Sequence, residues 1–279
     1  MKIKTLTLRC RYWRPGTDYI SCIASRVKDH VRDGDVLAVS EKAISTASGN
    51  IIDEATIKPG KLAWFLATLW TKRVWGGPLG RILGLKEQTL LNLKNYPEYE
   101  GATHKQLALS KTGFLQSLRH YSEGGIDASN LPYTYVSLPL NDAETIASSI
   151  REAIFDETGA SVTVMIVDGD TTYSKRNLHL APRKTETPGL IHFGGFMTFI
   201  IGRSFGFKAR QTPIAVSGEE INPDRALWYA RLFHKQCGGG AGRTAWSMSQ
   251  KMDTSLTGVT WEMLESVDHY PLTIIRIID

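Results

Sequence analysis

The sequence predicts an α/β fold in which mixed sheets are flanked by helices, organised as a single domain over residues 1–279. The first observation is that short apolar runs of strand length alternate with longer stretches whose apolar residues recur at helical spacing. The second is that no low-complexity linker or internal repeat divides the chain. The third is a composition of 42% hydrophobic and 22% charged residues, which is typical of a soluble globular protein.

Local patterns predict the elements of the first half. Residues 1–8 are expected to form a first strand, and a turn at 33–35 leads into a second strand at 36–39. Between residues 60 and 75, apolar side chains recur at helical spacing until glycines end the pattern. We expect this stripe to face the core; it consists of Leu62, Phe65, Leu66, Leu69 and Trp70.

The second half begins with a predicted helix over 142–157, where Asn141 and Glu144 can form a capping box and Gly159 ends the helix. This helix leads into an apolar run at 162–167, which we interpret as a buried strand that stops before Asp168. Asp168 is thus expected at the carboxyl end of a strand, where ligand sites in open α/β sheets gather.

The last third contains another helix and a closing strand. Asn222 is predicted to cap a helix that stops at Gly238, and a short helix around 261–264 precedes a final strand at 272–278. The apolar segment 189–201 is expected to be buried in the core. His179 and His192 have apolar neighbours, so we expect both to be core residues rather than ligands.

Several protein classes are excluded by what the sequence lacks. No apolar stretch approaches the roughly 18 residues that span a bilayer, and the first residues lack the apolar core of a signal peptide, so a cytoplasmic protein is expected. Cys10, Cys22 and Cys237 are too few and too scattered for a zinc framework, and we expect reduced thiols. No order of residues typical of a hydrolytic triad occurs.

The net charge of +5 raises the question of nucleic acid binding. Basic pairs occur at 72–73, 175–176 and 183–184, but they are dispersed, and no nucleic-acid-binding signature accompanies them. A pocket for phosphates and carboxylates also requires several cations. We therefore favour a small anionic ligand over nucleic acid.

Two loops carry acidic side chains that have little structural use. The first, residues 125–130, contains Asp127, and the second, residues 167–172, contains Asp168 and Asp170. Mg²⁺ is usually held by one or two carboxylates together with substrate phosphates, so the three residues together form a candidate metal and phosphate site. The alternative is that each Asp caps a turn. Taken together, the loops leave the two interpretations about even.

One glycine-rich loop, residues 237–244, resembles a phosphate-binding P-loop. It has Cys237 in place of the first glycine, Arg243 in place of the lysine, and it follows a helix rather than a strand. These differences exclude a Walker-type NTPase. The glycines still allow backbone N–H groups to approach an anion that Arg243 could clamp. The alternative interpretation is a helix C-cap followed by a flexible linker.

The order and spacing of three segments resemble the coenzyme F₄₂₀-0:L-glutamate ligase (CofE) family. These segments are residues 33–45, the 125–130 loop and the strand before Asp168. The resemblance implies a CofE-like mixed α/β fold and a cytoplasmic homodimer. It also implies a GTP-dependent ligase with two divalent cations, Mg²⁺ or Mn²⁺, that adds L-glutamate to a lactyl carboxylate of a deazaflavin precursor.

The resemblance also implies site residues. The cations are expected on Asp127 and Asp168, with Asp170 supplying the second metal position. The nucleotide is expected to contact Ser40, Glu41, Lys42, Ser45 and Asn130. Charge arguments add Lys42 and Arg243 as catalytic groups, because phosphoryl transfer is promoted mainly by positioning and by cations.

The sequence departs from the family at four places, which indicates a divergent branch. Thr46 replaces a lysine that contacts nucleotide, Gly169 replaces a threonine, and Arg225 replaces an acidic residue. Residues 75–109 form an insert without a counterpart in the family.

Three functions remain open from the sequence. The first is the ligase, acting on F₄₂₀-0 or on another acid such as a folate precursor. The second is a relative that binds nucleotide and metal but has lost the reaction, and the third is a basic nucleic-acid-binding protein. A homodimer is expected from the resemblance and from the apolar excess at 193–200.

Overall fold

The computed structural model describes residues 2–121 and 123–278, and it confirms the mixed α/β fold. Its larger sheet has the strand order β1-β9-β2-β5-β6-β7, and β8 also pairs with β5. The strands are β1 (Lys2–Cys10), β2 (Val36–Ser40), β5 (Thr163–Lys175), β6 (Leu178–Ala181), β7 (Ile191–His192), β8 (Lys208–Ser217) and β9 (His269–Ile278). The β2–β5 and β6–β7 pairs are parallel, whereas the other pairs in this sheet are antiparallel.

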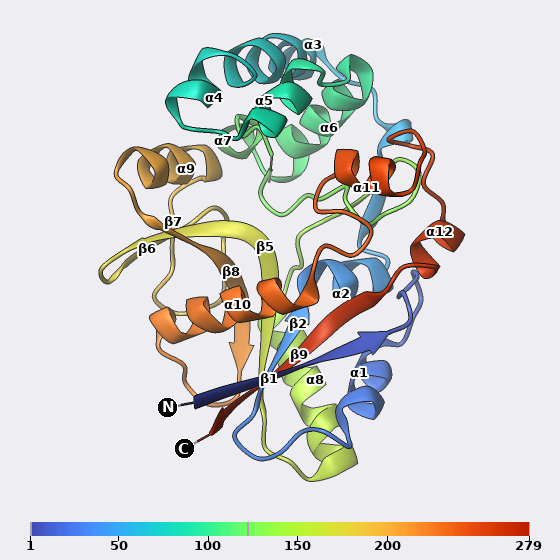
Figure 1. Cartoon of the computed structure of the whole chain (residues 1–279), viewed down its shortest axis with the longest axis vertical. Coiled ribbons are helices and arrows are strands. Elements are labelled where there is room, and N and C mark those ends of the chain that lie inside the picture. Colours follow the sequence, from blue (N-terminus) through green and yellow to red (C-terminus); the bar gives the residue numbers. More distant parts are fainter. Residues whose placement is uncertain (1, 122, 279) are drawn as a thin grey trace.

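Helices cover both faces of this sheet (Figure 1). The helices α1 (Tyr19–Val27) and α8 (Ala143–Thr158) pack on one face, and α10 (Pro223–Cys237) packs on the other. Alternate residues of a strand point to opposite faces. Accordingly, Leu37 belongs to the core cluster with α1 and α8, whereas Ala38 belongs to the cluster with α10.

A group of helices from residues 61–117 lies at one end of the molecule, beyond the sheet (Figure 1). We call this group the helical cap. It contains α3 (Lys61–Phe65), the π-helix η2 (Leu66–Trp75), α4 (Pro78–Ile82), α5 (Glu87–Lys94), α6 (Glu98–Lys111) and α7 (Phe114–Ser117). Residues 75–109, which the sequence predicts to be an insert, lie within this cap.

The remaining elements are mostly short. These are α2 (Glu41–Ala47), the 3-10 helix η1 (Glu54–Thr56), α9 (Gly195–Ser204), α11 (Ala245–Lys251), α12 (Trp261–Glu265) and a two-stranded sheet of β3 (Ile51–Asp53) and β4 (Tyr135–Ser137). Within residues 2–121 and 123–278, no helix is both long and apolar enough to cross a membrane.

The prediction that the central strand stops before Asp168 is wrong. β5 continues to Lys175 because β8 pairs with it along most of its length. The pairing is irregular between Asp168 and Thr171: Asp168 lies opposite Thr212, and Thr171 already lies opposite Gln211. Such a bulge locally interrupts the ladder and re-aims side chains, which is common next to functional sites.

The helix expected at 142–157 forms, but its predicted capping box does not. Asp142 is the N-cap in the left-handed conformation, and its own side chain makes no capping hydrogen bond. Instead, the carboxylate of Glu186 accepts a hydrogen bond from the Glu144 backbone N–H. A carboxylate from a distant segment thus satisfies the helix N-terminus, and local sequence spacing does not reveal it.

The expected core stripe at 60–75 is wrong for three of its residues. Leu66 is buried, but Leu62, Phe65 and Leu69 are 48%, 49% and 41% exposed. The buried side of α3 and η2 is formed by Ala63, Leu66, Ala67, Thr71 and Trp75. Of the three exposed residues, Leu69 lies in η2, which winds as a π-helix, so the 3.6-residue periodicity used for the prediction does not continue to it.

The segment 189–201 is buried only in part. Phe199 and Thr198 are buried, whereas Ile191, His192 and Phe193 are exposed, so the prediction of a core His192 is wrong. β7 pairs with the sheet on a single edge and leaves these side chains uncovered. His179 is a core residue as expected, and one of its ring nitrogens lies 3.0 Å from Ser174 Oγ.

Candidate functional site

A cavity of about 710 Å³ lies where the ends of β2, the bulge of β5, the 125–130 loop and the glycine-rich loop meet the helical cap. The parallel register places Ser40 opposite Val167, so the start of α2 lies beside the Asp168 segment. Of the predicted site residues, those that line the cavity are Ser40, Lys42, Asp127, Asn130, Asp168, Asp170 and Arg243. Glu41 and Ser45 lie outside its lining.

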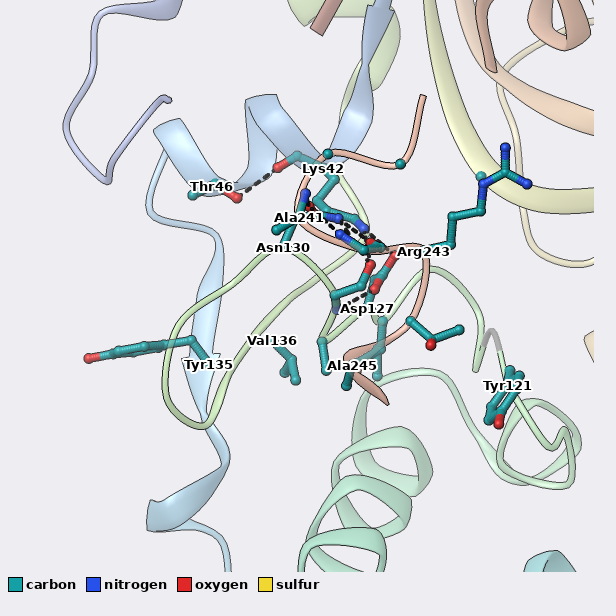
Figure 2. Close-up of a pocket in the computed structure, with 18 of the residues that line it drawn as sticks. Lys42, Thr46, Tyr121, Asp127, Asn130, Tyr135, Val136, Ala241, Arg243 and Ala245 are labelled. Atoms are coloured by element: carbon teal, nitrogen blue, oxygen red, sulfur yellow. Dashed lines mark hydrogen bonds and ion pairs between the residues drawn. The ribbon is translucent and has the colours of Figure 1, made fainter. Parts of the chain in front are cut away.

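Lys42 and Asp127 form an ion pair in the cavity (Figure 2). Lys42 Nζ lies 2.5 Å from Asp127 Oδ2 and donates to Ser129 Oγ at 2.6 Å. The other carboxylate oxygen of Asp127 accepts from the Ser129 backbone N–H at 2.7 Å. The Asp127 side chain is still 41% exposed, so it remains accessible to a ligand. The structure therefore places a cation and a carboxylate together at the end of β2.

Glu41 is buried beneath the cavity, where Arg183 holds it. Both Arg183 Nη atoms donate to the carboxylate, at 2.9 and 2.6 Å, and the Leu140 backbone N–H donates to Oε1 at 2.9 Å. Arg183 Nη1 also lies 3.3 Å from Asp168 Oδ2. A buried charge needs partners of this kind. Glu41 is consequently engaged with protein groups rather than directed at a ligand.

Asp168 and Asp170 concentrate negative charge in an enclosed space. Burial raises the pKa of Asp168 well above its usual range, and Asp170 and Glu41 raise it further, whereas Arg183 opposes the shift. Asp170 is only 6% exposed. Oxygen donors that repel each other fit a hard divalent cation, which would relieve this repulsion. In the described parts of the chain, however, no three His, Cys, Asp or Glu side chains are grouped closely enough to enclose a metal alone.

Asn130 fastens the glycine-rich loop to the 125–130 loop. Its Oδ1 accepts from the Ala241 N–H at 2.6 Å, and its Nδ2 donates to the Gly242 carbonyl at 2.7 Å. Figure 2 shows Asn130 and Ala241 side by side above Asp127. The Asn130 backbone has a φ of 57°, which Asn tolerates better than most residues. The side chain expected to contact nucleotide therefore positions a second loop.

The two remaining hydroxyl residues near α2 are engaged locally. Ser45 is buried and donates to the Leu138 carbonyl at 2.9 Å. Thr46, which is expected from the family resemblance to replace a lysine, is also buried and donates to the Lys42 carbonyl at 2.9 Å. The Ser45 hydroxyl fastens α2 to the segment that contains Leu138, whereas the Thr46 hydroxyl bonds within α2 and Ser40 caps its first turn.

Arg243 is exposed at the cavity wall and makes no hydrogen bond or ion pair with residues in the described part of the chain. In Figure 2 its side chain extends away from Lys42 and Asp127. His234 also lines the cavity, although sequence reasoning missed it. Burial lowers the His234 pKa, and the charges of Arg243 and Lys42 lower it further. These three side chains thus act on the same region electrostatically.

Residues 7–181 match the family model described as F420-0:Gamma-glutamyl ligase, which covers more than half of the chain. The chain belongs to the F₄₂₀-0:gamma-glutamyl ligase family. It is also 32% identical over 285 residues to an uncharacterized protein, MJ1361, of Methanocaldococcus jannaschii, an alignment that covers 99% of this chain and 97% of that protein. Both findings fit a divergent member of this ligase family, whose substrates include a carboxylate and glutamate.

The match to the gamma-glutamyl ligase family ends two residues before Arg183. Arg183, which pairs with Glu41 and Asp168, and the glycine-rich loop, which lines the cavity, therefore come from the remainder of the chain. In the sequence, Arg183 is apparent only as half of the dispersed basic pair at 183–184. The available signal was its place two residues after the run Leu178–Ala181, which forms β6.

The helical cap builds the other end of the cavity in this family member. Trp246 of α11 has its ring centroid 6.0 Å from that of Tyr96 and 5.4 Å from that of Tyr121. His104 Nδ1 and Nε2 lie 2.7 and 3.4 Å from carboxylate oxygens of Glu54 and Glu123. The two carboxylates outweigh the effect of burial and raise the His104 pKa to about 10. The helical cap thus contributes both aromatic and charged groups, which the sequence did not predict.

Proposed function

We propose that this protein is a nucleotide- and divalent-metal-dependent amide ligase that adds L-glutamate to a carboxylate substrate through an acyl phosphate. By family resemblance the nucleotide is GTP and the acid is of the F₄₂₀-0 type. The observation that carries the proposal is the convergence of Asp127, Asp168 and Asp170 on one cavity with Lys42 and Arg243. This combination of carboxylates and cations suits the phosphates of a nucleotide and their counterion.

The reaction follows from the weakness of a carboxylate as an electrophile. A substrate carboxylate oxygen attacks the γ-phosphorus of the nucleotide, and the nucleoside diphosphate leaves. The amino group of glutamate then attacks the acyl carbon, phosphate leaves, and the amine loses a proton. Negative charge spreads over the phosphoryl oxygens during transfer, so positioned cations lower the barrier.

The cavity residues take distinct parts in this proposal. Asp127, Asp168 and Asp170 would hold Mg²⁺ or Mn²⁺, which supplies positive charge to the nucleotide phosphates when bound. Lys42 Nζ lies 2.5 Å from Asp127 Oδ2, so it adds a positive charge beside this carboxylate. Arg243, which is not engaged by described residues, is available to meet charge that grows during transfer. Asn130 and Glu41 position the surrounding loops through the contacts described above.

The direct test is product formation. The purified protein is incubated with GTP or ATP, Mg²⁺ or Mn²⁺, L-glutamate and a panel of carboxylic acids that includes F₄₂₀-0 and folate precursors. Mass spectrometry should detect one acid extended by one glutamyl residue, with stoichiometric phosphate release. Arg243→Ala should reduce turnover by roughly tenfold to a thousandfold while nucleotide affinity changes little. Arg231→Ala, an exposed residue of α10, is the matched control.

The second candidate function is a relative that binds nucleotide and metal without turnover. The burial of Thr46 at the position of a nucleotide-contacting lysine favours it, because the hydroxyl is committed to the Lys42 carbonyl. Metal-dependent GTP binding without phosphate release or product over the whole panel would support this candidate and contradict the ligase.

A further inference from the structure

Arg183 lies against three of the segments that build the cavity. It binds Glu41 at the start of α2 through both Nη atoms, and Nη1 also reaches Asp168 in β5. Its third neighbour is Gly125, the first residue of the 125–130 loop. Arg183 is only 5% exposed, so its guanidinium group is shielded from solvent.

Gly125 has no room for a side chain because Arg183 occupies that space. A Cβ at position 125 would lie 2.0 Å from Arg183 Nη1 and 2.9 Å from its Cζ. The backbone there also has a φ of 94°, which favours glycine. The loop that carries Asp127 therefore packs directly against the guanidinium group.

The planar geometry of the guanidinium explains why arginine is suited to this position. Its fixed fork presents two donors to Glu41 while one of them also faces Asp168. A lysine ammonium is a point charge on a flexible stem and does not reproduce this planar arrangement. Outer contacts of this kind orient ligand-bearing side chains, and their loss typically weakens metal binding by roughly 10–100-fold.

We propose that Arg183 is a positioning residue that sets Asp168 and the 125–130 loop against the start of α2. This arrangement lets Asp127 and Asp168 face the same divalent cation on the nucleotide phosphates. The inference rests on the proposed function for its ligand, but the positioning itself is a property of the protein alone. A merely structural salt bridge would affect stability without changing how metal and nucleotide binding depend on each other.

The first variant is Arg183→Lys, and its matched control is Arg276→Lys. Arg276 makes a comparable two-point contact with buried Asp35, at 2.8 and 2.6 Å, beside the opposite end of β2. The second variant is Gly125→Ala, which displaces Arg183 without removing its charge. Its control is Gly124→Ala, where φ is also positive but the added Cβ would meet Thr112, at 3.0 Å, rather than Arg183.

The binding measurement is calorimetry of GTP at increasing Mg²⁺ concentration, with folding checked by circular dichroism. Arg183→Lys and Gly125→Ala should raise the Mg²⁺ concentration for half-maximal binding by roughly 10–100-fold. Both control variants should reach half-maximal binding at nearly the same Mg²⁺ concentration as the wild-type protein. If Arg183→Lys does not fold, the Gly125→Ala and Gly124→Ala pair decides. A folded variant that binds GTP and Mg²⁺ as the wild type does would overturn the proposal.

Hydrogen exchange of the ligand-free protein separates this inference from the proposed function. Backbone amides at 126–130 and 166–170 should exchange faster in Arg183→Lys and Gly125→Ala than in their controls. If wild-type protein bound no GTP at any Mg²⁺ concentration, the proposed function would fail. Faster exchange would then still support the positioning role, whereas unchanged exchange at both segments would refute it.

Discussion

At the scale of single residues, the surroundings of Asp168 disfavour the charged form of its carboxylate. Burial and the neighbouring carboxylates Asp170 and Glu41 raise its pKa, and Arg183 is the cation that counters them. A group kept in such surroundings is often functional, because the folded protein gains no stability from the repulsion itself. The bulge in β5 places this carboxylate at the cavity wall instead of in a regular ladder.

Asp168→Asn should remove the dependence of GTP binding on divalent cation without unfolding the protein. Asparagine keeps the shape of the side chain but lacks the charge that offsets cation dehydration. Calorimetry of GTP with and without Mg²⁺ measures the effect. Asp224→Asn, which alters a surface pair with Arg210, is the control and should behave as the wild type. An Asp168→Asn protein with normal metal dependence would show that Asp168 is not a ligand.

The pH dependence of stability should report on His104. Its pKa is about 10 in the folded protein because Glu54 and Glu123 stabilise the protonated ring, whereas the unfolded value is near 6.5. The protonated ring therefore stabilises the fold fully below pH 6.5. This contribution is lost as the pH rises towards 10.

The corresponding experiment compares wild type and His104→Gln by urea unfolding between pH 6 and pH 10. The variant should be less stable at pH 6, and the difference in free energy of unfolding should narrow as the pH approaches 10. His30→Gln, which changes a histidine outside the cavity lining, is the control variant. A constant difference across the range would contradict a protonated His104.

At the scale of elements, one wall of the cavity is formed by the glycine-rich loop, which has little regular secondary structure. The glycine-rich loop follows α10, as the sequence predicted, and its Thr244 caps α11 through a capping box with Ser247. Its attachment to the rest of the site is made by Asn130, and Lys251 adds a contact to the Gly240 carbonyl at 2.8 Å. The loop is therefore held by hydrogen bonds from side chains rather than by β-sheet pairing.

Asn130→Ala should loosen this loop and lower stability by about 1–3 kcal/mol, because it leaves the Ala241 N–H and Gly242 carbonyl without their partner. Urea unfolding measures the stability, and hydrogen exchange at 239–243 measures the loosening. Asn130→Gly is the companion variant, since it removes the same hydrogen bonds but tolerates the left-handed backbone. Loop exchange as slow as in the wild type in both variants would show that Asn130 does not hold the loop.

The elements that the sequence predicted well are those specified by local patterns. β2, α8, α10, α12 and β9 are close to their expected places because apolar spacing and end signals lie within each segment. The continuation of β5 was missed because it depends on β8, about forty residues later. Arg183 was missed for the same reason: its role exists only once folding brings Glu41 and Gly125 to it. The predicted metal and nucleotide roles stay predictions.

At the scale of the whole molecule, the helical cap and the sheet leave apolar side chains uncovered between them. Phe193 is 51% exposed, and Ile191, Met197, Phe114 and Leu115 are exposed as well. A Cβ added at Gly194 would lie 3.2 Å from the Leu115 side chain, so α7 and the start of α9 share this surface. The expectation of a single domain over 1–279 and that of a homodimer both remain predictions.

The purified protein should be a homodimer at micromolar concentration, since a second copy can cover this exposed surface. Light scattering gives the mass directly. Phe193→Asp should shift the protein towards the monomer. Phe155→Asp, which alters an exposed residue of α8, should not. A monomeric mass for the wild-type protein would contradict the prediction.

The contacts of Asn130 and Arg183 restrict which residues relatives can carry. A Cβ at position 240 would lie 2.5 Å from Asn130 Oδ1, as a Cβ at position 125 would collide with Arg183. Each pair joins the part of the chain that matches the family to the part beyond it. We therefore expect positions 130 and 240, and positions 125 and 183, to vary together during evolution. A lineage that replaces one partner becomes free to replace the other.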